Sequence, residues 1–113
     1  MLTLSVSDRS EDFQVLESTR SSQAAIMVLA PGERTGDPAR SEHPQADQWL
    51  YVLSGQGEAV GEKERHVLRP GMLLVIPAGQ GHEIRNRGSE PLRTLNVYSS
   101  LAYDSRGDPL SGP

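Results

Sequence analysis

The sequence of 113 residues contains no cysteine. It therefore has no disulfide framework, no cysteine nucleophile and no thiolate ligand, so any metal must be held by nitrogen and oxygen atoms. Aromatic residues make up only 4 % of the chain, lysine occurs once, at Lys63, and the net charge is −4. A basic patch interleaved with aromatic side chains is missing, which argues against nucleic acid as a partner.

Long apolar runs are also missing. The longest, Ala24 to Ala30, is far shorter than the roughly 20 residues that a membrane-spanning helix needs. The first residues, MLTLSVSDRSEDF, lack the basic start and apolar stretch of a secretory signal. We therefore expect a cytoplasmic protein with no membrane partner.

What the chain does have is turn formers between short apolar segments. Eleven glycines and eight prolines divide the sequence, and WLYVLSGQGEAV has the pattern of two strands around a hairpin turn. No segment shows a sustained helical period. About eight short strands predict an antiparallel sandwich or barrel over roughly residues 10–101, and the polar stretch 31–44 reads as a loop. We expect one domain, 1–103, followed by a flexible tail, 104–113.

One pattern in the second half of the chain is specific. Gly71, Pro77, Gly79, His82 and Asn86 fit G-x5-P-x-G-x2-H-x3-N at every position. This pattern resembles the second conserved motif of the cupin superfamily. The resemblance implies an all-β fold, a single double-stranded β-helix or jelly-roll barrel, in which four residues converge on a divalent metal.

The first cupin motif, G-x5-H-x-H-x3-4-E-x6-G, is similar to the stretch SEHPQADQWLYVLSG but is degraded there. Gly55 matches the closing glycine, and His43 stands at the second histidine position. Gln48 occupies the glutamate position and Ser41 the first histidine position. The resemblance therefore implies a metal site of His43, Gln48 and His82, in which zinc, nickel, iron or manganese would be bound weakly because an amide replaces a carboxylate.

Alternation along a strand predicts which side chains face the interior. Gln48 shares a face with Leu50 and Val52, whereas Trp49 and Tyr51 point the other way. If position 43 faces inward, then Ser41 does so too, and Glu42 points outward unless a bulge intervenes. The predicted ligand pocket consists of Ser41, Leu50, Val52 and Ile84.

Several polar residues have simpler interpretations. His66 lies in a polar segment and reads as a solvated surface histidine. Asn86 is more easily understood as satisfying backbone groups at a turn than as touching a ligand. Arg85 and Arg87, near Glu83, read as an exposed charged face.

Two functions of different classes follow from the resemblance. One is a non-catalytic barrel that binds a small polar metabolite, with or without a metal. The other is a metal-dependent enzyme, an isomerase or dioxygenase, on a small polar substrate. The degraded first motif favours the binding module slightly. The apolar runs QAAIMVLA and WLYVLS further predict a homodimer, since they offer more apolar surface than one small barrel can hide.

Overall fold

The structure, a computed structural model, describes residues 1–6 and 11–110. This part of the chain forms nine β-strands and contains no helix, so none that could cross a membrane, and the all-β prediction is confirmed. The strands are β1 (Phe13–Ser18), β2 (Gln23–Leu29), β3 (Arg34–Asp37), β4 (Asp47–Ser54), β5 (Gly57–Val60), β6 (Arg65–Leu68), β7 (Leu73–Ile76), β8 (His82–Arg85) and β9 (Leu92–Ser99).

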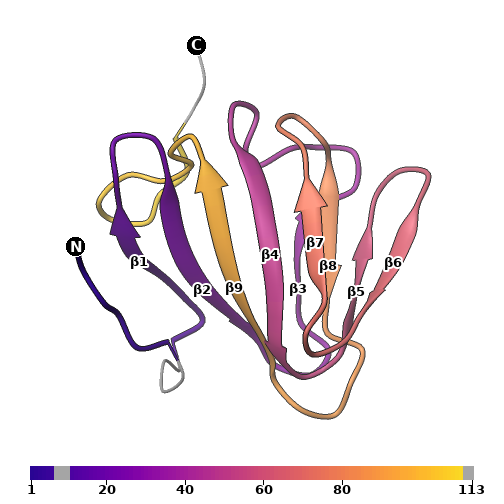
Figure 1. The fold of residues 1–113 in the computed structure, drawn as a ribbon. Coiled ribbons are helices and arrows are strands. Elements are labelled where there is room, and N and C mark those ends of the chain that lie inside the picture. Colours follow the sequence, from indigo (N-terminus) through magenta and orange to yellow (C-terminus); the bar gives the residue numbers. More distant parts are fainter. Residues whose placement is uncertain (7–10, 111–113) are drawn as a thin grey trace.

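The strands form two antiparallel sheets (Figure 1). The five-stranded sheet has the order β1-β2-β9-β4-β7, and the four-stranded sheet has the order β3-β8-β5-β6. A cluster of buried apolar side chains joins them. It is made of Leu29, Leu50, Val52, Ala59, Leu68, Ile84 and Leu92, which come from both sheets. The arrangement is the double-stranded β-helix that the motifs predicted.

Strand β4 shows the predicted alternation. Gln48, Leu50 and Val52 are buried, whereas Trp49 and Tyr51 are exposed on the outer face. Period-two alternation of this kind is what one buried and one solvated sheet face require. The inward direction of Gln48 is thus set by its place in the strand.

Strand β3 differs from the prediction, because residues 34–37 were expected to be loop. The segment has no apolar alternation, but it pairs with β8 through its backbone, and ladder hydrogen bonds need no apolar side chain. Gly36, at φ 97°, lies so close to β8 that a Cβ there would collide with the carbonyl oxygen of His82. A glycine therefore lets β3 pack directly against the strand that carries this histidine.

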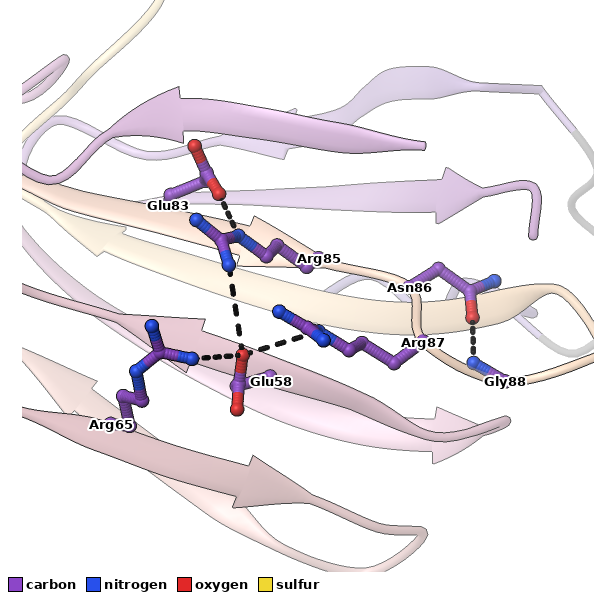
Figure 2. A network of polar contacts seen from close by, with 7 residues as sticks. All are labelled: Glu58, Arg65, Glu83, Arg85, Asn86, Arg87 and Gly88. Atoms are coloured by element: carbon purple, nitrogen blue, oxygen red, sulfur yellow. Dashed lines mark hydrogen bonds and ion pairs between the residues drawn. The ribbon is translucent and has the colours of Figure 1, made fainter. Parts of the chain in front are cut away.

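The outer face of the four-stranded sheet is charged. Figure 2 shows Arg85 between Glu83 and Glu58, both of which are largely shielded from solvent, with Arg65 and Arg87 also directed at Glu58. Because His82 and Ile84 alternate with Glu83 and Arg85 along β8, these charges point away from the interior. The expectation of a charged outer face holds, although two of its carboxylates are more buried than a solvated face implies.

The chain after β9 folds back on itself up to the end of the described part. Asp104 N donates to Asp108 O at 2.9 Å, and Leu110 N donates to Ala102 O at 2.8 Å. The side chain of Asp104 also accepts hydrogen bonds from the backbone of the same turn. The flexibility predicted for 104–113 stays a prediction, and residues 111–113 lie outside the described part.

Candidate functional site

The two motif histidines are brought together by a shared backbone contact. The carbonyl oxygen of His43 accepts hydrogen bonds from Ala46 N and from Gly79 N, each at 3.3 Å. The first bond closes the turn that carries His43, and the second ties this turn to the Pro77–Gly81 turn that precedes His82. The glycine-rich turn of the second motif therefore serves to dock one histidine loop against the other.

His82 opens β8 with a defined orientation and tautomer. Its Nδ1 lies 3.0 Å from the carbonyl oxygen of Gln80. Because a carbonyl can only accept, Nδ1 carries a proton and donates it, and Nε2 is the nitrogen left to contact a ligand. This arrangement, with one ring nitrogen bonded to a backbone carbonyl and the other free, is the usual state of a metal-binding histidine.

His43 is a neutral imidazole held among aromatic rings. Only 5 % of it is exposed, and its ring centroid lies 5.8 Å from that of His82 and 4.8 Å from that of Tyr98. Burial, with a smaller contribution from His82, lowers the pKa of His43 to about 4. At neutral pH the ring is therefore unprotonated and keeps a lone pair that a metal or a hydrogen-bond donor can use.

Gln48 is oriented by a chain of buried hydrogen bonds. Its Nε2 donates to Asn96 Oδ1 at 2.9 Å, and Asn96 Nδ2 donates to Thr94 Oγ1 at 3.0 Å. Thr94 in turn donates to the carbonyl oxygen of Met27. With both ends of Asn96 engaged, the amide of Gln48 presents Oε1, which has no hydrogen-bond partner.

The segment that follows β9 adds Tyr103 to the site. Tyr103 OH lies 3.3 Å from His43 Nε2, and the ring of Tyr103 packs on Phe13 and Tyr98 at centroid distances of 4.8 and 5.2 Å. Its backbone is held by Gln23, whose Oε1 accepts from Ala102 N and Tyr103 N and whose Nε2 donates to Tyr103 O. Burial raises the pKa of Tyr103 to about 12.

These side chains surround a cavity of about 370 Å³. His43, Gln48 and His82 all line it, together with Tyr98 and Tyr103. Of the predicted pocket residues, Ile84 also lines the cavity.

The structure does not bring Ser41, Leu50 and Val52 to the cavity wall. Leu50 and Val52 are fully buried in the apolar core, because the interior is filled with side chains on this side of Gln48. Ser41 is turned toward the backbone, where its Oγ accepts a 3.0 Å hydrogen bond from His43 N.

Glu42 is also placed differently from expectation. It is exposed to solvent, as an outward residue would be, but it also lines the cavity, whereas alternation predicted that it would point outward unless a bulge intervened. Residues 41–46 form bends and a turn, and the strand begins only at Asp47. The period-two rule therefore does not apply to the loop that holds His43 and Glu42.

Comparison with known proteins identifies the family. The family model described as "Cupin domain" matches residues 25–98. The chain belongs to the cupin family. This match covers both motifs and every strand from β3 to β8, so the cupin assignment rests on the same residues that build the site.

Individual relatives agree with this assignment. The chain is 33 % identical over 90 residues to uncharacterized protein L612 of Acanthamoeba polyphaga mimivirus, a match that covers 76 % of this chain and 54 % of the relative. It is 35 % identical over 74 residues to tetracenomycin polyketide synthase protein TcmJ of Streptomyces glaucescens, covering 66 % and 48 %. The chain thus spans about half the length of these curated relatives.

A solved structure shows the same fold. The crystal structure of BH2720 from Bacillus halodurans superposes with a TM-score of 0.77 at 22 % identity, over 91 % of this chain and 78 % of that one. At this level of identity the likeness concerns the fold alone.

The resemblance to the cupin motifs implies a divalent metal, so the donor atoms around the cavity decide whether such an ion fits. No group of three or more His, Asp or Glu side chains in the described part is placed to hold a metal. The cavity does offer the imidazoles of His43 and His82 and the unpartnered Oε1 of Gln48. Nitrogen and oxygen donors of this kind suit zinc, nickel, iron or manganese. The residues therefore fit such an ion, in a site that has one negative charge fewer than a site with a carboxylate ligand.

Sequence reasoning missed the aromatic part of the site. Tyr98 lies on the inward face of β9, in register with Gln48 of β4, so alternation along β9 would have found it. Tyr103 follows the last strand and belongs to no motif, and only its contacts in the folded chain reveal it.

Proposed function

We propose that this cupin binds a small polar metabolite in the cavity between its sheets, through a divalent metal held by His43, Gln48 and His82. The observation that carries the proposal is the pair of buried polar atoms without a partner, His43 Nδ1 and Gln48 Oε1. An unsatisfied buried polar group costs on the order of 1–3 kcal/mol. Two such atoms beside one cavity are best explained by a bound group that satisfies them.

The rest of the cavity wall is consistent with a small organic ligand. Apolar and aromatic side chains, among them Phe13, Met27 and Ile84, form much of the wall, while Glu33, Arg34 and Glu42 also line it. A mostly apolar pocket with a few placed polar groups is the usual form of a small-molecule site. The metal, when bound, would polarise an oxygen atom of the ligand, and the surrounding rings would exclude water from it.

A titration tests this function. Chelator-treated protein is titrated with Zn²⁺ or Ni²⁺ by calorimetry, and native mass spectrometry of untreated protein reports any small molecule that co-purifies. We expect one metal per chain and a large loss of affinity in His82→Ala, with no change in the exposed control His66→Ala. A polyketide belongs among the added probes, because one relative is named as a polyketide synthase protein. Equal binding by the two variants would refute the site.

The alternative function, a metal-dependent isomerase or dioxygenase, gains one observation from the structure. Proton transfer on a substrate requires a general base within the site, and Glu42 supplies a carboxylate at the cavity wall. Under this alternative, Glu42→Gln would abolish turnover but leave metal affinity unchanged. If the protein only binds its ligand, neither wild type nor Glu42→Gln would show turnover.

We also propose that two copies of the chain associate through the outer face of the five-stranded sheet. Trp49 lies beside Val75 and Val97, and Tyr51 lies beside Leu73, in the register of β4 with β7 and β9. These five side chains are 45, 48, 38, 41 and 56 % exposed, respectively. Together they present on the order of 400 Å² of apolar surface, which is within the range of the largest patch on a typical monomer, a patch that is often functional.

A second copy of the same face fits this surface best. A two-fold axis through the patch would cover both copies with one self-complementary contact. With a polar rim around it, the patch could form the core of a standard interface of about 800 Å² per partner.

A further inference from the structure

Two arginines face each other where strand β3 pairs with strand β8. Arg34 of β3 and Arg85 of β8 are direct partners in the strand register, and they alternate with Thr35 and Ile84, which line the interior cavity. Like charges that lie directly opposite one another in a sheet destabilise the pair of strands. Each of the two arginines therefore needs a group of opposite charge beside it.

Arg85 has carboxylate partners, but they lie away from β3. Glu83 is on the same strand as Arg85, and Glu58 is on β5, which borders β8 on the side opposite to β3. Glu58 is shared with Arg65 and Arg87, each at 3.3 Å. Figure 2 shows these two glutamates serving three arginines. No carboxylate of this network is left over for the arginine of β3.

Arg34 is the arginine that stays without such a partner. It is exposed, and it takes part in no ion pair within residues 1–6 and 11–110. The carboxylate next to it in the sequence, Glu33, is engaged elsewhere, because its Oε1 accepts a 2.6 Å hydrogen bond from Ala30 N. A chain whose net charge is −4 thus has a local surplus of positive charge at this end of the sheet.

The surplus lies at a hollow of about 660 Å³. Three positive charges and one negative charge line this hollow. Its lining residues are Arg34, Arg85 and Arg87, together with Gly32, Glu33, Asn86 and Gly88. A concave surface on which one sign of charge prevails concentrates ions of the opposite sign. The hollow is therefore suited to an anion.

The two segments that form the hollow are fixed to one another by their backbones. Asn86 N donates to Glu33 O at 2.9 Å, and Gly32 N donates to Asn86 O at 3.2 Å. The side chain of Asn86 holds its own segment by accepting a hydrogen bond from Gly88 N (Figure 2). The backbone that carries the arginines is thus in place before a ligand arrives, which reduces the entropy lost on binding.

We propose that this hollow binds an oxyanion, the phosphate or carboxylate group of a small molecule, between Arg34 and Arg87. Arg34 contributes a whole guanidinium group. Arg87 contacts Glu58 through Nε, but its side chain remains 56 % exposed, so part of its guanidinium is open to a ligand. The planar guanidinium group matches the oxygen atoms of phosphates and carboxylates. Arg85, held by its two glutamates, adds positive charge at the wall.

This site differs from the proposed metal site. None of its three arginines belongs to the donor set of the cavity, and the inference does not require a metal. The two sites are neighbours, because Glu33 and Arg34 line both the hollow and the interior cavity. A test must therefore show on which side of β3 an anion is held.

The test uses inorganic phosphate as the probe and, in a second arm, acetate. Chelator-treated protein is titrated at constant ionic strength, so that neither a metal in the cavity nor a change in screening can explain the response. Backbone amide and arginine Nε–H signals are followed by nuclear magnetic resonance in wild type, Arg34→Gln and Arg87→Gln. Arg20→Gln is the matched control, because Arg20 is exposed between β1 and β2 and does not line the hollow.

We expect saturable shifts at residues 32–34 and 86–88 in wild type and in Arg20→Gln. Arg34→Gln and Arg87→Gln should each bind the anion about tenfold or more weakly, because a hydrogen bond to a charged group is lost. The anion that binds more tightly identifies the group as phosphate or carboxylate. Unchanged affinity in both variants would overturn the inference, as would shifts confined to the interior cavity or no saturable shift with either anion.

Discussion

Gln48 and Asn96 are joined by a buried 2.9 Å hydrogen bond from Gln48 Nε2 to Asn96 Oδ1. Because Thr94 fixes the opposite end of Asn96, the bond determines that Gln48 presents an oxygen and not an NH₂ group as its free atom. Oxygen can bind a metal, whereas the amide nitrogen cannot. Asn96 and Thr94 are therefore positioning residues for the proposed ligand.

Gln48→Glu is expected to tighten Zn²⁺ binding by about tenfold, because it adds a negative charge to a site of neutral donors. The same change is expected to lower the free energy of unfolding of the metal-free protein by about 1–3 kcal/mol. The reason is that a carboxylate oxygen takes the place of Gln48 Nε2, so Asn96 Oδ1 loses its hydrogen-bond donor. Calorimetric titration and urea unfolding measure the two effects.

Gln45→Glu is the matched control for added charge, because Gln45 is exposed in the loop that precedes β4. It should leave both quantities within about 0.5 kcal/mol of wild type. Unchanged metal affinity in Gln48→Glu would count against Gln48 as a ligand.

The pH dependence of stability should carry the signature of His43. Its pKa in the folded protein is about 4, lowered by burial and by His82, and a histidine in the unfolded chain titrates near 6.5. Between these values the unfolded chain binds a proton that the folded protein does not. The free energy of unfolding of metal-free protein should therefore fall as the pH is lowered from 6.5 to 4, by up to about 3 kcal/mol from this residue.

Urea unfolding at several pH values, compared between wild type and His43→Gln, isolates this contribution from that of the carboxylates. The difference between the two proteins should change over the interval from pH 6.5 to 4. The exposed His66, which pairs with Glu64 at the surface, gives the control variant His66→Gln. Parallel curves for wild type and His43→Gln would contradict the buried neutral state.

Asn86, the last residue of the second motif, acts through the backbone. Its Nδ2 donates to Leu29 O and Glu90 O, and its Oδ1 accepts from Gly88 N, all at 2.8 Å (Figure 2 shows the last of these). Asn86→Ala should cost about 2–4 kcal/mol of unfolding free energy, because it leaves these buried groups unpaired. The exposed Gln56→Ala is the control, and a loss below about 1 kcal/mol in Asn86→Ala would contradict this role.

The proposed dimer is tested by light scattering at micromolar concentration. Wild type is expected to have the mass of two chains, and Trp49→Glu is expected to have the mass of one, since a charge at the centre of a two-fold apolar contact faces its own copy. Val67→Glu alters an exposed apolar residue of β6 on the other sheet and should remain dimeric. A monomeric wild type would exclude the proposal.

Much of the fold was predictable because turn formers and alternation determine strands locally. Gln48, Leu50 and Val52 were placed on the inner face of β4 by parity alone, and they are buried. Strand β3 was not predictable, since its pairing with β8 uses backbone groups and a close approach at Gly36. Such pairing leaves no apolar pattern in the sequence.

The site was predictable to the extent that it lies within the two motifs. Motif spacing brought His43, Gln48 and His82 to one cavity, although it did not show the carbonyl contact that docks their loops. Alternation did not show that the exposed Glu42 also lines the cavity, because the residue lies in a turn where the period of two does not apply. The backbone of Tyr103 is held beside the cavity by hydrogen bonds with Gln23, and a contact between residues so far apart in the chain has no local signature.

The most direct test of the metal site is the metal content of untagged protein purified without chelator, measured by elemental mass spectrometry. The account predicts close to one equivalent of zinc, nickel, iron or manganese per chain in wild type and in His66→Ala, and its loss in His43→Ala and in His82→Ala. A wild-type protein without any of these metals that also takes up none from solution would contradict it, as would the same content in all four proteins.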